Sequence, residues 1–144
     1  MATVYGAGRT KVLAVPSQKV NPGEAGGKLQ VVYDEYTFLA EMAANDIIEM
    51  QLVVPAGARI VEAGIVCPST GATGIFQLGT SGDADALVAS ADAGGQAVKA
   101  LADAAAADLM KEVSAETSYQ VKCTELTAAA TGLKLKAFVS YIQL

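Results

Sequence analysis

The sequence predicts an all-β protein, a jelly-roll-like antiparallel β-sandwich preceded by an extended N-terminal arm. Segments with the period-two alternation of a pleated strand recur roughly every eight to twelve residues. Glycine, proline and small polar residues separate these segments, as they do in sandwiches and barrels. No sustained apolar stripe with helical spacing appears in the alanine-rich residues 83–113. About eight strands are expected from these segments.

The first 28 residues are rich in glycine, proline and small polar side chains, which is typical of an arm and not of a domain. The strand pattern begins at Leu29, so residues 29–144 form the expected sandwich domain. Strands are expected at residues 29–39, 48–54, 59–67, 75–78, 96–101, 108–113, 119–124 and 132–144. In the third of these, strict alternation places Val61, Ala63, Ile65 and Cys67 toward the core.

The alanine-rich stretch at residues 83–113 leaves two interpretations open. In the first, Asp83 caps a short helical turn at 83–89, and strands follow at 96–101 and 108–113. In the second, the high helix propensity of alanine produces one surface helix over residues 96–111. Gly94 and Gly95 interrupt the alanine run and weigh against one longer helix.

The last expected strand is apolar on both faces near its end. Its inner face carries Leu133, Leu135, Ala137, Val139 and Tyr141. Phe138, Ile142 and Leu144 lie on the opposite face, where a half-exposed strand would be polar. The strand is therefore expected to be central in its sheet or to end against a neighbouring molecule.

A similar conflict occurs in the first strand, because Tyr33 cannot share a face with Tyr36 and Phe38 in a regular strand. Either a bulge or a strand covered on both sides accounts for this, or one side is a contact patch for another subunit.

Composition favours a protein that assembles with others. Hydrophobic residues make up 52% of the 144 residues and charged residues 17%, against about 25% charged in typical domains. The net charge of −5 and the scattered lysines and arginines argue against a nucleic-acid partner. Apolar runs are far shorter than the roughly 18 residues that a membrane span needs. The N-terminus lacks the apolar stretch of a signal peptide, so synthesis in a cytoplasm and no membrane partner are expected.

Residues for enzyme chemistry are missing. The chain has no histidine, which excludes Ser–His and Cys–His catalysis and histidine-ligated zinc. Cys67 and Cys123 are expected to be buried free thiols. Asp83, Asp85 and Asp92 could suit Ca²⁺, but the EF-hand positions for glycine and glutamate hold Val88 and Gly94. We therefore expect no enzyme activity, no catalytic residue, no metal and no cofactor.

Several segments resemble those of small virion proteins of tailed bacteriophages. They are residues 55–60 (PAGARI), 75–80 (IFQLGT), 82–89 (GDADALVA), 132–135 (GLKL) and 139–142 (VSYI). The resemblance implies a capsid decoration, or cement, protein made in the host cytoplasm. Such a protein forms a homo-oligomer, often a trimer, on the capsid surface at junctions between major capsid proteins and stabilises the shell.

An alternative function is a receptor- or glycan-binding jelly-roll module of a head fibre or tail. For the decoration function, the expected contacts with other subunits lie in the arm and on the first and last strands. They are Tyr5, Arg9, Lys11, Val12, Leu13, Tyr33, Tyr36, Phe38, Phe138, Ile142 and Leu144.

Overall fold

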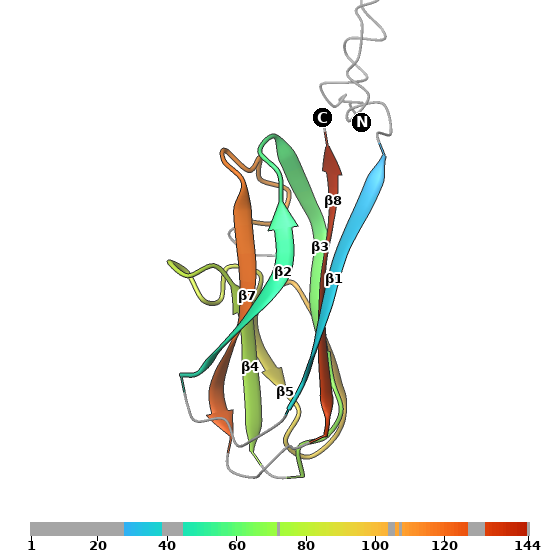
Figure 1. Cartoon of the computed structure of the whole chain (residues 1–144), viewed down its shortest axis with the longest axis vertical. Coiled ribbons are helices and arrows are strands. Elements are labelled where there is room, and N and C mark those ends of the chain that lie inside the picture. Colours follow the sequence, from blue (N-terminus) through green and yellow to red (C-terminus); the bar gives the residue numbers. More distant parts are fainter. Residues whose placement is uncertain are drawn as a thin grey trace, which may run out of the picture.

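The computed structural model describes residues 28–38, 45–71, 73–103, 106, 108–126 and 132–143, and within these ranges it contains eight strands and no helix (Figure 1). The strands are β1 (Leu29–Thr37), β2 (Ile47–Val54), β3 (Ala58–Cys67), β4 (Gly74–Gly79), β5 (Val88–Asp92), β6 (Val98–Leu101), β7 (Thr117–Leu126) and β8 (Lys134–Gln143). The all-β prediction is confirmed. In this part of the chain no helix is long and apolar enough to cross a membrane.

The strands form two four-stranded antiparallel sheets. Sheet A has the order β1-β8-β3-β6, and sheet B has the order β2-β7-β4-β5. The chain pairs β1 with β8, β2 with β7, β3 with β6 and β4 with β5, as in one long folded hairpin. Pairing of β3 with β8 and of β4 with β7 rolls that hairpin into two layers. This winding is a jelly roll, which confirms the predicted fold class.

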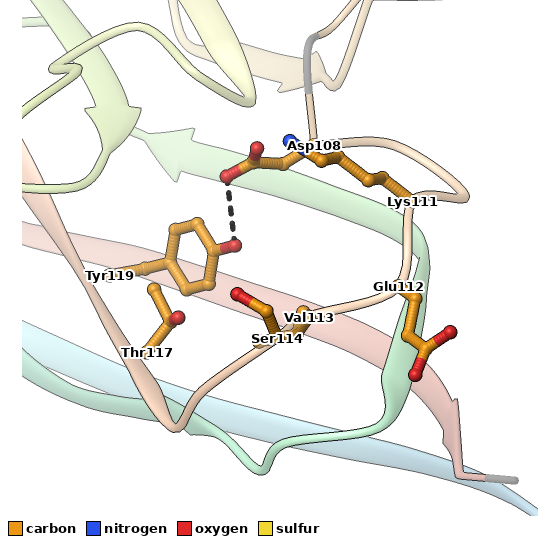
Figure 2. A pocket seen from close by; sticks show the side chains of 7 residues that line it. All are labelled: Asp108, Lys111, Glu112, Val113, Ser114, Thr117 and Tyr119. Carbon is orange, nitrogen blue, oxygen red and sulfur yellow. Dashed lines mark hydrogen bonds between the residues drawn. The ribbon is translucent and has the colours of Figure 1, made fainter.

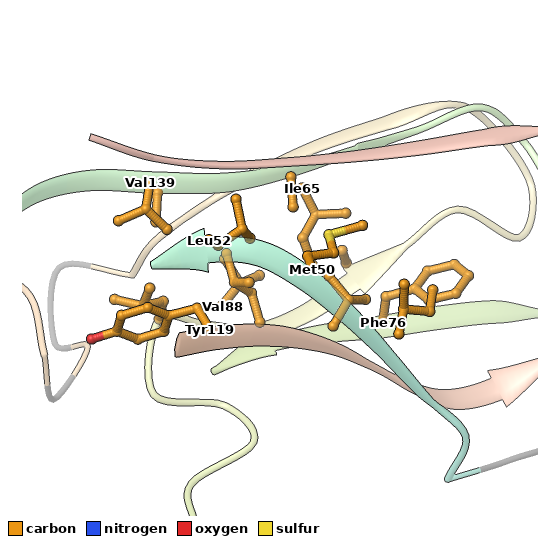
Figure 3. Packing of buried hydrophobic residues seen from close by; sticks show 14 of the residues in the cluster. Met50, Leu52, Ile65, Phe76, Val88, Tyr119 and Val139 are labelled. Atoms are coloured by element: carbon orange, nitrogen blue, oxygen red, sulfur yellow. The ribbon is translucent and has the colours of Figure 1, made fainter. Parts of the chain in front are cut away.

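The core lies between the two sheets and consists of the alternate residues that face inward. In β2, for example, Ile48, Met50, Leu52 and Val54 are buried while their neighbours are more exposed. Figure 3 shows Leu52 and Phe76 from sheet B and Ile65 and Val139 from sheet A within the apolar layer between the two sheets. Each fully buried side chain of this size contributes about 1.5–3 kcal/mol to folding. The interior therefore joins the two sheets into one unit.

The structure corrects the prediction for the alanine-rich stretch. Residues 98–101 form the expected strand, so a helix over 96–111 is wrong. The helical turn expected at 83–89 is also wrong, because Val88–Asp92 is β5 and pairs with β4. The strand expected at 108–113 is reduced to two isolated bridges, Ile60 with Leu109 and Arg59 with Glu112. Here pairing with β3 and β4 outweighs the helix propensity of alanine, which is a weak local preference.

Two bulges also change what strict alternation predicts. The register of β3 against β8 shifts between Ile60 and Glu62, so Val61 is exposed and not buried as expected. In β2 the register shifts between Glu49 and Leu52. The amide of Gln51 in this bulge donates to the Asp34 carboxylate on β1 at 2.9 Å. Asp34 therefore links the edge of sheet A to the edge of sheet B.

Other predictions about single residues are confirmed. Strand β8 is central in sheet A, between β1 and β3, which is one of the two arrangements expected from its apolar faces. Cys67 and Cys123 are free and buried. Burial raises the pKa of the Cys67 thiol to about 11, and it raises the pKa of Cys123 as well. Asp83 does accept a hydrogen bond from the Ala86 amide, but with its backbone carbonyl.

Candidate functional site

Exposed apolar side chains gather on the outer face of sheet A. Seven large hydrophobic residues are exposed in the described part of the chain, and five of them lie on strands of this sheet. These five are Leu29, Val31, Tyr33, Val61 and Leu101. Strict alternation brings the first three to the same side of β1. More than half of the surface of each of these three side chains is exposed, at 55–58%.

One row of residues crosses the whole of sheet A on this face. Tyr33 on β1 is paired with Phe138 on β8, Phe138 with Gly64 on β3, and Gly64 with Leu101 on β6. Paired residues in antiparallel strands project to the same face. A Cβ at Gly64 would lie 2.8 Å from Cε1 of Phe138, so the ring of Phe138 lies across the glycine. The row is therefore continuous and flat at its centre.

Two shorter rows extend the apolar surface toward the end of the sheet where β1 begins. Val31 is paired with Ser140, and Leu29 with Ile142. On β3 these two rows continue with Glu62 and Arg59, which are charged. The apolar residues on this half of the sheet, here called the apolar half of the outer face, are Leu29, Val31, Tyr33, Val61, Leu101, Phe138 and Ile142. An exposed apolar patch of this kind is a candidate interaction surface.

The other half of the same face is charged. Glu35 on β1 is paired with Lys136 on β8, Lys136 with Val66 on β3, and Val66 with Lys99 on β6. Glu35 also lies 3.9 Å from Lys134 and accepts a 2.9 Å hydrogen bond from the Tyr33 hydroxyl. That hydrogen bond raises the pKa of Tyr33, because ionised tyrosine could not donate it. The Tyr33 hydroxyl thus lies at the border between the apolar half and the charged half of the outer face.

The outer face of sheet B is mainly polar by contrast. Strand β2 presents Glu49 and Gln51, and β7 presents Gln120 and Lys122. A hollow of about 640 Å³ lies over these two strands and is lined by polar residues together with Met50, Val53 and Tyr119. The polar lining residues are Asp34, Glu49, Gln51, Ser81, Ser118 and Gln120.

A second, smaller hollow of about 110 Å³ lies between the 108–114 segment and β7 (Figure 2). The Tyr119 hydroxyl donates a 3.0 Å hydrogen bond to the Asp108 carboxylate there. Burial and the nearby negative charge of Asp108 raise the pKa of Tyr119, so the hydroxyl stays protonated. The hollow is well below the roughly 300 Å³ of ordinary ligand pockets. Its hydrogen bond fastens the segment to the sheet.

The described residues contain no group of three or more His, Cys, Asp or Glu side chains placed to hold a metal ion. The acidic loop singled out from the sequence brings Asp83 and Asp85 together. A hydrogen bond to Asp85, with partial desolvation and the charges of Asp85 and Asp108, raises the pKa of Asp83. The two carboxyl groups thus interact with each other.

Among the contact residues expected from the sequence, Tyr33, Phe138 and Ile142 come together in the apolar half. Tyr36 is half-buried and packs edge-on against Phe38, with ring centroids 5.3 Å apart. Phe38 departs from the expectation of an exposed contact, because its ring is fully buried and lies 6.0 Å from that of Phe76. The remaining ones, Tyr5, Arg9, Lys11, Val12, Leu13 and Leu144, lie outside the described residues.

Sequence reasoning missed Leu29, Val31, Gly64 and Leu101. Leu29, Val31 and Tyr33 recur at every second position, which places all three on one face of β1. This spacing was a usable signal in the sequence. Gly64 and Leu101 gave no local signal, because their position in the row depends on which strands are neighbours.

Comparison with known proteins identifies the fold more closely. No family model and no curated protein sequence matches the chain. Among solved structures, a chain of the capsid of Ralstonia phage GP4 matches with a TM-score of 0.67 and 24% identity, covering 82% of this chain and 86% of that chain. A chain of the cyanophage Pam1 capsid asymmetric unit matches with a TM-score of 0.66 and 17% identity, and the match covers 100% of this chain and 92% of that chain.

A third match is a chain of the acid-stable capsid of Helicobacter pylori bacteriophage KHP30, with a TM-score of 0.55 and 13% identity. This match covers 79% of this chain and 86% of that chain. At these identities the similarity establishes a shared fold. The chain thus has a jelly-roll fold that also occurs in chains of phage capsid structures.

Proposed function

We propose that this protein is a structural component of a bacteriophage virion that binds the outside of the capsid and stabilises it as a decoration protein. The observation that carries the proposal is the apolar half of the outer face of sheet A, on a fold shared with chains of three phage capsid structures. A sandwich that folds by itself needs no apolar residues on that face, whereas a subunit of a shell does.

The structural similarity supports a role in the virion, and within that role we favour a protein added to the shell. The three matches cover most of this chain and most of the matched chains, so those chains are similar to it in length. A single sandwich of this size offers a compact block that can be added to a shell assembled from a larger major capsid protein. The partners in this proposal are the major capsid protein and further copies of the chain.

Stabilisation follows from repeated modest contacts. Each copy that bridges neighbouring capsid subunits removes apolar surface from water, which contributes about 25 cal/mol per Å². Subunits that are linked to several neighbours must break several contacts before they leave the shell, so weak interfaces reinforce one another. The protein would act through these contacts and would catalyse no reaction. A trimer placed where capsomers meet would give three such links.

The test is addition of the purified protein to capsids of its own phage that lack it. We expect saturable binding, detected by cosedimentation, and a higher temperature of shell disruption in a thermal-release assay. Electron microscopy of the reconstituted particles should place the protein on the outer surface. Failure to bind, or binding to the inner surface, would contradict the decoration role.

The hollow over β2 and β7 favours a second candidate function, a glycan-binding module. Its carboxylate, amide and hydroxyl side chains are groups that bind sugar hydroxyls. The chain has no tryptophan to stack on a sugar ring, which counts against this alternative. Specific binding on a glycan array that is lost in Glu49→Gln, with the fold unchanged, would favour it over the decoration role.

A further inference from the structure

We propose that the apolar half of the outer face of sheet A is covered, in the free protein, by the N-terminal arm of the same chain, with residues 12–15 as the segment that docks. The arm is residues 1–28, of which only Lys28 lies within the described residues. The inference goes beyond the proposed function, because it concerns the protein before it meets a capsid. Three observations select this occupant: where the arm joins the sheet, the size of the apolar half and the charges of both parts.

The arm joins sheet A directly beside the apolar half. Its last residue, Lys28, precedes Leu29, which is exposed and belongs to the apolar half. Strand β1 begins at the end of the sheet where β8 ends, and Leu29 is paired there with Ile142 (Figure 1). The arm needs only a reversal of chain direction to reach the apolar half, and residues 21–27 (NPGEAGG) supply turn-forming residues for it.

The apolar half is small and suits a short segment. From Leu29 to Tyr33 it measures about 13 Å along β1, and from β1 to β6 it measures about 14 Å. With the outer side chains its area is at most about 400 Å², below the roughly 600 Å² per partner that a stable interface between two domains buries. Residues 12–15 (VLAV) are the longest apolar run of the arm, and four extended residues are about 13 Å long. The segment therefore matches the apolar half in length.

The linker between this segment and the sheet has a suitable reach. Residues 16–28 separate Val15 from Leu29, and a linker of about thirteen residues spans about 20 Å on average. By the dimensions above, the far corner of the apolar half also lies about 20 Å from Leu29. A tethered segment whose reach matches the distance to its site has a local concentration in the millimolar range. A segment of another molecule lacks this advantage in dilute solution, which favours the arm of the same chain.

The net charges of the arm and the domain are opposite. The arm carries Arg9, Lys11, Lys19 and Lys28 against Glu24, a net charge of +3. Because the whole chain carries −5, residues 29–144 carry −8. Long-range attraction therefore holds the arm near the domain.

Glu62 gives this attraction a specific target. Its side chain is exposed in the row that contains Val31 and Ser140, and it forms no ion pair or side-chain hydrogen bond among the described residues. Arg59, the charged residue of the neighbouring row, already lies 3.6 Å from the Glu112 carboxylate. Lys11 immediately precedes the apolar run of the arm. Docking of that run brings the Lys11 ammonium group within reach of the Glu62 carboxylate.

Such a cover removes exposed apolar side chains from water while the protein is free, and so protects it from nonspecific association. For the decoration role, the arm has to leave the face when neighbouring virion subunits contact it. The arm and the capsid would then compete for the same surface.

The test places a nitroxide spin label on the arm of the full-length protein, at Ala14→Cys. Cys67 and Cys123 are buried and the pKa of each thiol is raised, so the introduced cysteine reacts selectively. Paramagnetic broadening of the amide signals in ¹H–¹⁵N spectra then reports which residues lie near the label.

We expect the amide signals of Val31 and Glu62 to lose at least twice as much intensity as that of Gln120 on the outer face of sheet B. A second sample mixes spin-labelled protein that lacks ¹⁵N with ¹⁵N protein that lacks the label, and it should show no broadening. Broadening in the mixed sample would mean that the arm of a neighbouring molecule covers the face. That result, or equal broadening on both sheets, would overturn the proposal.

Charge variants test the contact with Glu62. In Glu62→Lys the broadening at Val31 should fall at least threefold, because the new ammonium group repels Lys11. Glu49→Lys is the matched control, since it makes the same charge change at an exposed position on sheet B and should leave the broadening unchanged. Lys11→Glu combined with Glu62→Lys should recover most of the loss. An equal loss in the control, or a double variant without recovery, would contradict the contact.

These results are distinguishable from failure of the proposed function. If the arm docks as expected but the protein does not bind capsids, the decoration role fails and the docking of the arm stands. If the protein binds capsids but the label broadens no signal of sheet A in the free protein, the inference fails and the decoration role stands.

Discussion

The outer faces of the two sheets differ although the sheets have the same number of strands and share one core. Sheet A exposes Leu29, Val31 and Tyr33 on its first strand, whereas the corresponding edge strand of sheet B exposes Glu49 and Gln51 and one apolar residue, Ile47. Folding requires only that the inner faces be apolar. The mainly polar outer face of sheet B indicates that folding does not require an apolar exterior, and we propose that the exposed apolar residues of sheet A serve contacts with other molecules.

The largest effect is expected from the interior that both sheets share. Phe76→Ala removes a fully buried ring from the inner face of sheet B and should lower the free energy of unfolding by about 3–5 kcal/mol. Leu135→Ala, on the inner face of sheet A, should cost about 2–5 kcal/mol. Urea unfolding followed by circular dichroism checks both. A small loss in only one of them would mean that the sheets do not share one core.

A smaller effect is expected where the apolar row crosses Gly64. In Gly64→Ala the new Cβ would crowd the Phe138 ring and the Ala100 carbonyl oxygen, which should cost about 1–3 kcal/mol. Gly95→Ala is the control, because a Cβ there has no atom within 4 Å. The same unfolding measurement compares the two. Equal stabilities would show that the ring does not lie across the glycine.

The contact between the edges of the two sheets should contribute less. Asp34→Ala removes the carboxylate that accepts hydrogen bonds from the backbone amides of Glu35 and Gln51 at 2.8 and 2.9 Å. The free energy of unfolding should fall by about 1 kcal/mol. Asp34→Asn keeps one oxygen acceptor and should lose about half as much. Hydrogen exchange should also speed up at the Gln51 amide. Unchanged exchange in Asp34→Ala would contradict this contact.

The smallest effect on folding should come from the exposed residues that distinguish the two faces. In dilute protein, Val31→Thr and Ile47→Thr should each change the free energy of unfolding by less than about 0.5 kcal/mol, because both side chains are exposed. In the capsid-binding assay only Val31→Thr should bind more weakly than the unaltered protein, since Val31 lies on the face proposed to contact other virion subunits. Equal capsid binding by the two variants would remove the functional difference between the faces.

Much of the fold could be predicted from the sequence because alternation is a local property. The inward residues of β2, β7 and β8 follow from it directly, and the two apolar faces of β8 correctly indicated a central strand. Prediction from alternation failed where strand pairing decided the structure. A bulge exposes Val61, and the alanine-rich residues 88–92 form a strand that pairs with β4.

The candidate site was predictable only in part for the same reason. Tyr33, Phe138 and Ile142 stood out as aromatic or apolar residues on a face expected to be polar. Phe38 looked equivalent to them, but it follows the end of β1 and packs into the core beside Phe76. Gly64 and Leu101 had no distinguishing local pattern.

By itself the sequence determined the strand periodicity, the buried thiols and the lack of histidine chemistry, because these depend on residue type and spacing alone. Only the tertiary structure decided that Tyr33, Phe138, Gly64 and Leu101 form one row, since these residues come from four strands far apart in the chain. Strand pairing is non-local: it is determined by how the whole hairpin rolls into two sheets, and that arrangement creates the face on which the proposed function depends.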